Sequence, residues 1–272
     1  MHVRVEPLPP WLDQERLLGN FSWQLQPLSD GLLAAEARVP VTEAALLLAR
    51  LRGLGLDGRA LSVGIRPNLS REEVRHGRLL EARARRASTV GFTRHTALAT
   101  GEGHFSLTPE PLALAMGLQA GGRSVVDACC GSGGNAVGFA RAGSQVVAIE
   151  LDGQRIAEAR HNARLYGVQE RIRFIQGDAL ALLPTLRAEL LFVDPPWGER
   201  YDKLRTDRRS LPLLDALLSS PMPQFGELWL KVPPSFATAE IPGCAARAWF
   251  GEAEGDRQRI KFLQLSRPSA AV

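Results

Sequence analysis

The fold is decided by the stretch Val125-Val-Asp-Ala-Cys-Cys-Gly-Ser-Gly-Gly-Asn135. An apolar strand is predicted over Ser124–Ala128, a glycine turn follows it at Gly131–Gly134, and a helix is predicted over Asn135–Ala142. Glycine allows the backbone to adopt positive φ and to approach a ligand closely. A strand, a glycine turn and a helix in this order are typical of nucleotide-binding α/β units.

Strands and helices alternate along the chain after this stretch. The predicted strands, in chain order, are Gln145–Glu150, Ile172–Gln176, Glu189–Val193, Glu227–Lys231, Ala246–Phe250 and Ile260–Leu265. A helix is predicted over Gly153–Tyr166, between the first two of them. This alternation predicts an α/β protein with a mostly parallel, doubly wound sheet, which binds ligands at the carboxyl ends of its strands.

The first hundred residues have a different pattern and predict a small α/β unit. Strands are predicted over Phe21–Pro27, Leu32–Val39 and Ala60–Ile65. A helix is predicted over Val41–Leu54, with Thr42 as its N-cap. An arginine-rich helix is predicted over Arg71–Ser88, with Ser70 as its N-cap.

Length and composition allow one large domain with a smaller companion. We expect an N-terminal unit over residues 1–95, a candidate for RNA binding, and a main domain over residues 96–272. With 45% hydrophobic and 23% charged residues, the chain is typical of a soluble globular protein. This composition excludes a disordered chain and a collagen-like fibre.

Membrane segments and metal sites are not expected from the sequence. No apolar run approaches the roughly 18–20 residues of a membrane span, and the first residues lack the apolar core of a secretory signal. The three cysteines, two of them adjacent at Cys129 and Cys130, have neither a disulfide pattern nor the spacing of a zinc site. We therefore expect a cytoplasmic monomer that needs no metal.

The excess of positive charge lies in one segment. The net charge is +4, and Arg71–Arg94, with seven arginines and three acids, carries the whole of it. Such a segment is either a solvated helix face with internal salt bridges or a surface that binds phosphates, and its sequence leaves both open. On the second interpretation, RNA phosphates contact the Lys203–Arg209 stretch and the side chains of Arg83, Arg85 and Arg86.

Three acidic residues follow three successive predicted strands. They are Asp127 in the glycine stretch, Glu150 at the end of the next strand, and Asp178 after the third. A carboxylate at Glu150 can accept hydrogen bonds from both hydroxyls of a ribose. The segment Asp178-Ala179 can accept from the exocyclic amine of an adenine. Each acid could instead be a turn or N-cap residue, but three in register favour a nucleotide cofactor.

Two nucleotide cofactors fit this pattern. Gly131-x-Gly133-x-x-Ala136 matches the loose dinucleotide fingerprint, in which the glycine turn holds a pyrophosphate. S-adenosylmethionine (SAM) has no phosphate, but its ammonium group needs a carboxylate nearby. Asp127, at the mouth of the first strand, suits SAM better, and SAM is therefore the expected cofactor.

The stretch Asp194-Pro195-Pro196-Trp197 directly follows a predicted strand and indicates methyl transfer to an amine. The exocyclic amine of a base is a poor nucleophile, because its lone pair is delocalised into the ring. The Asp194 carboxylate and the Pro195 carbonyl can accept its two N–H bonds and draw the nitrogen towards tetrahedral geometry. Trp197 offers a flat face on which the base can stack. A simple turn with a buried tryptophan is the alternative, which the cofactor pattern in the same chain disfavours.

Together with three further motifs, the glycine stretch and this tetrapeptide resemble the trimethylguanosine synthase family, the RNA cap guanine-N2 methyltransferases. The further motifs are Phe105-Ser-Leu-Thr-Pro-Glu110, Ala159-Arg-His-Asn-Ala163 and Tyr166-Gly167. The resemblance runs from about Gly101 to the C-terminus. It implies a class I, Rossmann-like methyltransferase fold, SAM as methyl donor and guanine N2 in RNA as acceptor. It also implies that Phe105 and Thr108 cover the cofactor, that Asn162 helps to hold the guanine, and that Trp197 stacks on it.

The chain departs from the family's pattern at the tetrapeptide. Eukaryotic members have Ser-Pro-Pro-Trp-Gly-Gly where this chain has Asp194-Pro-Pro-Trp-Gly-Glu199. Aspartate is usual among the wider group of amino-methyltransferases, which favours guanine in a structured RNA over a methylated cap. Two alternatives remain open. One is a DNA adenine or small-molecule amine methyltransferase with the same site, and the other is a catalytically silent RNA-binding protein on a methyltransferase fold.

Overall fold

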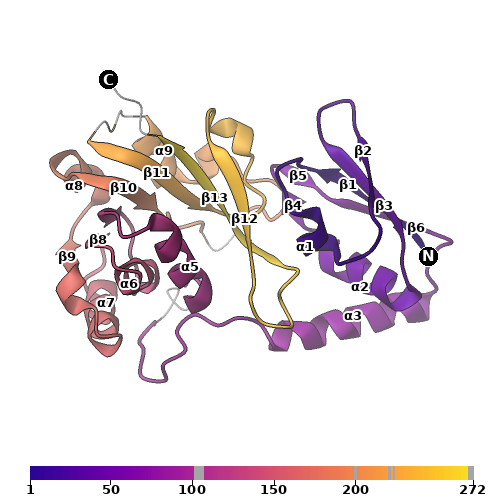
Figure 1. Ribbon diagram of the computed structural model, residues 1–272, viewed down its shortest axis with the longest axis horizontal. Coiled ribbons are helices and arrows are strands. Elements are labelled where there is room, and N and C mark those ends of the chain that lie inside the picture. Colours follow the sequence, from indigo (N-terminus) through magenta and orange to yellow (C-terminus); the bar gives the residue numbers. More distant parts are fainter. Residues whose placement is uncertain (101–106, 199–200, 220–221, 223, 269–272) are drawn as a thin grey trace.

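Two β-sheets from different parts of the chain organise the structure, a computed structural model that describes residues 1–100, 107–198, 201–219, 222 and 224–268. A four-stranded sheet lies in the N-terminal part and a seven-stranded sheet in the C-terminal part. Figure 1 shows them at opposite ends of an elongated molecule, with helix α3 (Arg71–Arg86) along the lower side of the N-terminal part. No helix among the described residues is long and apolar enough to cross a membrane.

The seven-stranded sheet has the order β12-β13-β11-β10-β7-β8-β9. Its strands are β7 (Val125–Asp127), β8 (Val146–Glu150), β9 (Ile172–Gln176), β10 (Ala188–Val193), β11 (Phe225–Val232), β12 (Ala245–Phe250) and β13 (Ile260–Pro268). Strands β7 to β11 pair in parallel, whereas β13 runs antiparallel to its neighbours β11 and β12. This is the Rossmann-like arrangement of a class I methyltransferase, so the predicted fold class is confirmed.

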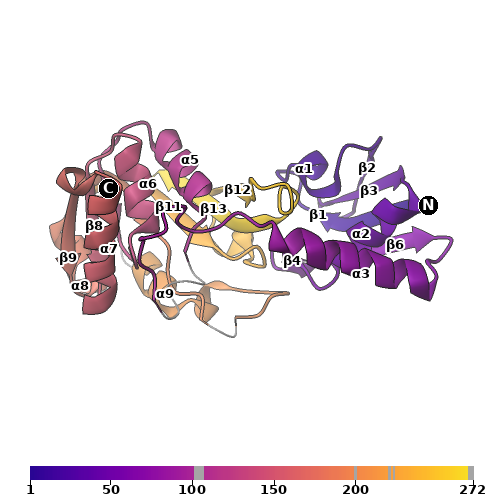
Figure 2. The ribbon, with the colours of Figure 1, turned by 90° about the horizontal axis from the view of Figure 1, so that it is seen from below.

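Helices cover both faces of this sheet, as parallel strands require for their burial. They are α5 (Glu110–Ala120), α6 (Gly134–Arg141), α7 (Gly153–Leu165), α8 (Ala179–Leu182) and α9 (Pro212–Leu218), with 3-10 turns at Gln169–Arg171, Leu183–Thr185, Arg208–Ser210 and Thr238–Glu240. Figure 2 shows α5 and α6 above the strands and α9 below them. Side chains of successive strand residues point to opposite faces of the sheet. In β10, Phe192 therefore packs with α5 and α6 on one face, and Leu191 packs with α9 on the other.

The N-terminal sheet is antiparallel and has the order β2-β3-β1-β6. Its strands are β1 (His2–Leu8), β2 (Gln24–Pro27), β3 (Leu33–Arg38) and β6 (Ser62–Arg66). The hairpin of β4 (Gly55–Leu56) and β5 (Arg59–Ala60) and the helices α1 (Gln14–Leu18) and α2 (Val41–Leu51) complete this part. Strand β1 lies in the middle of the sheet but is absent from the predicted strands. Its signal is the alternation of Val3 and Val5, both buried, with polar residues.

The predicted N-caps of the two long helices have different outcomes. Ser70 Oγ accepts from the Glu73 N–H and the Glu73 carboxylate accepts from the Ser70 N–H, which confirms the predicted cap of α3. The predicted cap of α2 is wrong, because Thr42 lies inside the helix and Pro40 occupies the N-cap position. Gly77 allows α3 to approach α2, because a Cβ there would overlap with the α2 backbone.

Contacts at the end of α3 and in the β4–β5 hairpin are among those that join the N-terminal part to the C-terminal part. Near the carboxyl end of α3, the buried Glu81 forms an ion pair with Arg259, which directly precedes β13. In the β4–β5 hairpin, the Gly55 N–H donates to the Lys203 carbonyl at 2.9 Å and the Asp57 N–H donates to the Pro234 carbonyl at 3.0 Å. The predicted boundary between residues 95 and 96 stays a prediction.

Candidate active site

Four acidic residues lie at one edge of the large sheet. Asp127 ends β7, Glu150 ends β8, Asp178 directly precedes α8 after β9, and Asp194 directly follows β10. The strands β10, β7, β8 and β9 are parallel neighbours in that order, so their carboxyl ends meet at the same edge. The structure therefore brings together the acids that were predicted from separate motifs.

Asp127 is a buried acid without a partner. Its side chain is completely buried, and neither carboxylate oxygen makes a hydrogen bond of ordinary geometry within the described chain. Burial and the nearby Asp194 carboxylate raise the pKa of Asp127 to about 8, against a weaker lowering by the Cys129 backbone N–H. A buried polar group with no bond costs stability, so this carboxyl group points to a ligand that carries an N–H donor.

The glycine turn lies beside Asp127, and its backbone shape requires glycine. Gly131 and Gly133 have φ angles of 53° and 91°, in the left-handed region. A Cβ on Gly133 would lie 3.0 Å from the Ala159 Cβ of α7. The Gly131 N–H donates to Glu150 Oε2 at 2.9 Å, so the second acid is bonded to the turn itself.

Glu150 and Asp178 use part of their bonding capacity on the backbone. Glu150 Oε1 accepts from the Asp152 N–H at 2.9 Å. Asp178 is the N-cap of α8, and its Oδ1 accepts from the Leu180 N–H at 2.9 Å. Ala179, which follows it, is buried. A carboxylate has about four acceptor positions, so both acids can still receive donors from a ligand.

Asp194 is held by two side chains. Its Oδ2 accepts from Lys231 Nζ at 2.6 Å and from Asn135 Nδ2 at 3.1 Å. Burial raises the pKa of Asp194, and the Lys231 ammonium and the Asn135 amide oppose this rise. No hydrogen bond to Oδ1 comes from the described residues, so this oxygen is left to accept from a ligand.

The Trp197 ring stands beside this carboxylate. Lys231 Nζ lies over the ring, 5.4 Å from its centroid, and Tyr201 packs edge-on against it with the two centroids 5.7 Å apart. Trp197 is half-buried, and its Nε1 has no hydrogen-bond partner within the described chain. Pro195, between Asp194 and the ring, is buried. The tetrapeptide thus places an acceptor oxygen and a flat ring next to each other.

Two residues of this site, Lys231 and Asn135, are absent from the predicted set. Lys231 is the one charged residue in the apolar run Leu228–Val232, and lysine is rarely buried without a partner. A lysine within an apolar strand was therefore the sequence signal from which a buried partner of Asp194 could have been predicted. Asn135 belongs to the glycine stretch, but its type alone does not distinguish a helix-start residue from a partner of Asp194.

The residues that the resemblance places over the cofactor are described only in part. Phe105 lies outside the described residues. Thr108 is buried, and its Oγ1 makes no hydrogen bond to any described residue. Leu107, which precedes it, packs against Gly134 of the glycine turn. This segment therefore lies against the predicted cofactor side of the site.

Asn162, to which the resemblance assigns a contact with the guanine, is bonded to backbone groups. Its side chain is completely buried. Oδ1 accepts from the Leu98 N–H at 2.8 Å, and Nδ2 donates to the carbonyls of Leu98 and Ser132 at 2.7 and 2.8 Å. Because both amide protons are used, Asn162 fastens the segment around Leu98 to the glycine turn. A direct contact with guanine stays a prediction, which these bonds disfavour.

The predicted phosphate-binding residues come from two separate segments, helix α3 and the stretch that follows Tyr201. Exposed arginines near the carboxyl end of α3 are Arg83, Arg85 and Arg86. In the Lys203–Arg209 stretch, the Lys203 carbonyl bonds to the N-terminal part. Arg208 donates to the Asp215 carbonyl at 3.0 Å and to Ser219 Oγ at 2.8 Å, so its guanidinium is already engaged.

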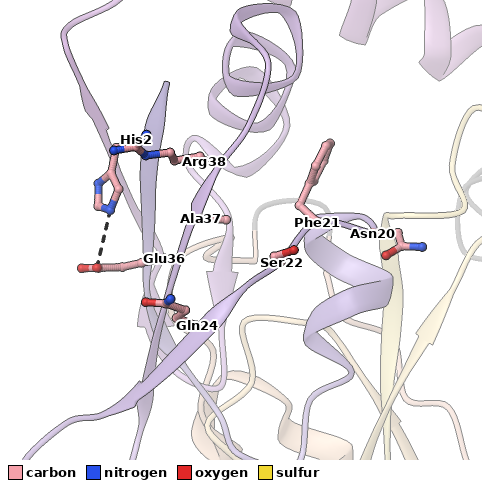
Figure 3. A pocket seen from close by; sticks show the side chains of 8 residues that line it. All are labelled: His2, Asn20, Phe21, Ser22, Gln24, Glu36, Ala37 and Arg38. Atoms are coloured by element: carbon pink, nitrogen blue, oxygen red, sulfur yellow. Dashed lines mark ion pairs between the residues drawn. The ribbon is translucent and has the colours of Figure 1, made fainter.

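A separate hollow of about 940 Å³ lies on the N-terminal part. Figure 3 shows its lining, which is His2, Asn20, Phe21, Ser22, Gln24, Glu36, Ala37 and Arg38. His2 and Glu36 face each other, with His2 Nε2 3.6 Å from Glu36 Oε2. None of the predicted site residues is among the lining, so the hollow is not the predicted site.

Comparisons with known proteins agree with the predicted resemblance. Residues 122–208 match the family described as RNA cap guanine-N2 methyltransferase. The chain is 38% identical over 104 residues to trimethylguanosine synthase of Schizosaccharomyces pombe, which covers 35% of this chain and 43% of that protein. It is 43% identical over 84 residues to ribosomal RNA small subunit methyltransferase J of Rhodopseudomonas palustris, covering 28% and 38% of the two chains.

Among solved structures, the crystal structure of TrmN from Thermus thermophilus is similar over 99% of this chain and 100% of that chain, with 18% identity and a TM-score of 0.46. The chain spans less than half the length of the two curated relatives. The segment that matches the family contains the glycine turn, all of the acids at the carboxyl edge and the tetrapeptide at 194–197. The predicted resemblance to the trimethylguanosine synthase family is thereby confirmed over residues 122–208.

Proposed function

We propose that this chain is a SAM-dependent N-methyltransferase that acts on the exocyclic amine of a base in RNA, with guanine N2 as the acceptor. One observation carries the proposal. The partnerless buried carboxyl of Asp127 and the Asp194–Trp197 stretch lie after the neighbouring strands β7 and β10. The descriptions of the matching family and of the relatives, which are RNA methyltransferases, support it.

The cofactor fits the acids at the carboxyl edge. Asp127 has two free oxygens in a buried place, which suit the ammonium of SAM. Glu150 would accept from the ribose hydroxyls and Asp178 from the adenine amine, each with the lone pairs that the backbone leaves over. When bound, SAM supplies an electrophilic methyl group.

The acceptor base fits the Asp194–Trp197 stretch. Asp194 Oδ1 is free to accept one amine hydrogen, and the Pro195 carbonyl would accept the other. The ring of Trp197 would hold the base by stacking. Lys231 and Asn135 already fix the Asp194 carboxylate, so the rate would come from positioning and from acceptors set in place beforehand.

RNA is the proposed partner because of one face of α3. With 3.6 residues per turn, this face covers about 100° of the helix circumference, beside the side that carries the buried Gly77 and Glu81. We call its exposed arginines the arginine stripe, which consists of Arg71, Arg75, Arg78, Arg85 and Arg86. Arg83 projects to the side of the stripe. A row of guanidinium groups along one helix suits the phosphates of a nucleic-acid strand.

The test is mass spectrometry of nucleosides. RNA from cells that lack the gene is incubated with SAM and with the wild-type protein, with Asp194→Ala or with Glu170→Ala. Glu170 is exposed and lies just before the amino end of β9, at the end of the strand away from the carboxyl edge, so its variant is the matched control. We expect a methylguanosine with the methyl on N2 from the wild type and the control, and none from Asp194→Ala.

Other outcomes separate the alternatives. Methylated adenine in DNA, with RNA unmodified, would favour the DNA methyltransferase. Calorimetric binding of S-adenosylhomocysteine (SAH) without methyl transfer to RNA, DNA or amines would contradict the proposed RNA methyltransferase. RNA binding without binding of SAH would favour the catalytically silent protein.

A further inference from the structure

Lys231 touches both groups that the proposed function assigns to the acceptor base. Its side chain is 5% exposed and comes from β11, next to the strand that carries Asp194. Nζ lies 2.6 Å from Asp194 Oδ2 and 5.4 Å from the Trp197 ring centroid. Phe262 of β13 closes its other side, 5.2 Å from Nζ to the ring centroid. The ammonium is therefore fixed inside the site.

The first consequence concerns charge. The ammonium of Lys231 balances the carboxylate of Asp194, and Asn135, the remaining bonded neighbour, is neutral. The other acid that faces this pair is Asp127, which the proposed function pairs with the ammonium of the cofactor. Among the described residues of the site, no carboxylate is left to balance a positively charged base.

The second consequence concerns the stacking surface. An aromatic face attracts a cation, and on Trp197 the face towards Lys231 already carries one. A base that stacks on the ring must use the other face. A cationic base there would meet the Lys231 charge through the ring, in a buried place where screening is weak. An uncharged base would not meet this repulsion.

We propose that Lys231 sets the acceptor site for an uncharged base and against a cationic one, such as 7-methylguanine. The inference rests on the proposed function, because it takes Asp194 and Trp197 as the groups that hold the base. It assigns a specificity role to Lys231, which acts on the substrate through the side chains that it contacts.

The experiment compares two probes that differ in one methyl group and one charge. These are the nucleotides GTP and 7-methyl-GTP, each with a single base, titrated into the protein saturated with SAH. The pH is mildly acidic, so that 7-methylguanine keeps its ring charge. The proteins are the wild type, Lys231→Met, which removes the charge at similar length, and Lys231→Arg, which keeps it.

We expect the wild type to bind GTP at least as tightly as the methylated form. Lys231→Met should shift the ratio of the two affinities by about tenfold towards the methylated form, and Lys231→Arg should keep the ratio of the wild type. In the double variant Lys231→Met with Asp194→Asn, part of this shift should disappear, because no carboxylate can then balance the cation.

Controls separate folding from specificity. The affinity for SAH, measured by calorimetry, shows whether each variant is folded, and a ratio of two affinities cancels a partial loss of active protein. An unchanged ratio in a folded Lys231→Met, or a wild type that prefers the methylated form, would overturn the inference and leave the proposed function intact. If the wild type binds SAH but neither nucleotide, the guanine acceptor of the proposed function fails, and this inference fails with it.

Discussion

The carboxyl edge of the large sheet and the arginine stripe both concentrate charge, but they keep it in different surroundings. At the edge, Asp127 is completely buried without a bond and Asp194 is held by a buried lysine. On the stripe every arginine is exposed, and Arg85 alone makes an ion pair with a described residue, 3.6 Å from Glu81. Buried charges interact strongly and are costly to leave unpaired, whereas exposed ones are screened. Changes at the edge should therefore have large effects that salt hardly alters, and changes on the stripe should have small ones that salt controls.

The largest effect is expected at Asp194. Its bond to the amine strengthens only as the nitrogen becomes tetrahedral, so Asp194→Ala should lower kcat by about 100-fold or more. Asp194→Asn keeps an acceptor oxygen and should retain more activity than alanine. The measurement is steady-state kinetics on one identified RNA, with SAH affinity measured in parallel. Equal turnover of the wild type and Asp194→Ala would show that residues 194–197 form a well-packed turn without a catalytic role.

The buried carboxyl group of Asp127 should make the free energy of unfolding depend on pH. Its pKa is about 8 in the folded protein and roughly 3.9 in an unfolded chain. The native state thus holds a proton that the unfolded state has released, so the free energy of unfolding should fall as the pH rises from about 4 to 8. Asp127→Asn cannot release a proton and should be more stable than the wild type at pH 8. Urea denaturation without cofactor at acid and at mildly basic pH checks the difference.

The same variant should separate stability from binding. Asp127→Asn should weaken SAH binding by about 1.5–3 kcal/mol, because the ammonium of SAH favours the ionised carboxylate and an amide cannot ionise. Binding of 5′-methylthioadenosine, which lacks the amino-acid part, should change little. A variant that is more stable and still binds SAH like the wild type would show that Asp127 does not face the ammonium.

The effect of changing Trp197 should lie between those of the buried acids and of the exposed arginines, because its ring is only half-buried. Trp197→Ala should weaken binding of the RNA by about 1–3 kcal/mol and leave SAH affinity unchanged. Trp197→Phe should be milder, since a flat face remains. Both are read from KM and kcat on the same RNA. A loss confined to kcat would mean that the ring positions the amine and does not bind the base.

The smallest effect is expected on the stripe. Arg75→Glu with Arg78→Glu should raise the KM for RNA and flatten the plot of log affinity against log salt by roughly 0.7 for each phosphate that the variant no longer binds. Arg187→Glu is the matched control, because this arginine is exposed and belongs to the other part of the molecule. A variant Arg83→Glu with Arg86→Glu tests whether the predicted carboxyl-terminal arginines contribute as well. A salt dependence equal in all variants would make the stripe a solvated helix face.

Much of the fold follows from local signals in the sequence. The buried strands of the large sheet are short apolar runs, and the acids directly after them are visible in the same pattern, which is why Asp127 and Asp194 could be named. The ion pair of Asp194 with Lys231 could not be predicted in this way. It depends on β10 and β11 being neighbours, and the two residues are 37 positions apart in the chain. Local patterns carry no such pairing information.

The wrong cap of α2 has an equally physical cause. Thr42 is a good capping residue by type, but Pro40 fixes the chain direction two residues earlier and starts α2 there. The contact of Asn162 with guanine stays a prediction, although three backbone groups already bond to its amide. The predictions of a cytoplasmic location, of a monomer and of the domain boundary concern properties that no contact within the described chain decides, and they stay predictions.

The ion pair of Glu81 with Arg259 makes the two parts of the molecule depend on each other for their stability. Glu81 is buried by this contact, and Arg259 donates to the Glu81 carbonyl as well. Asp256, three residues earlier, accepts from the Thr89 N–H at 2.7 Å and from Thr89 Oγ1 at 2.9 Å. If the N-terminal part unfolded alone, Arg259 would lose the carboxylate of Glu81, and Asp256 would lose Thr89 and keep Lys261 as its ion-pair partner. The two sheets should consequently melt in a single cooperative transition, as one folding unit.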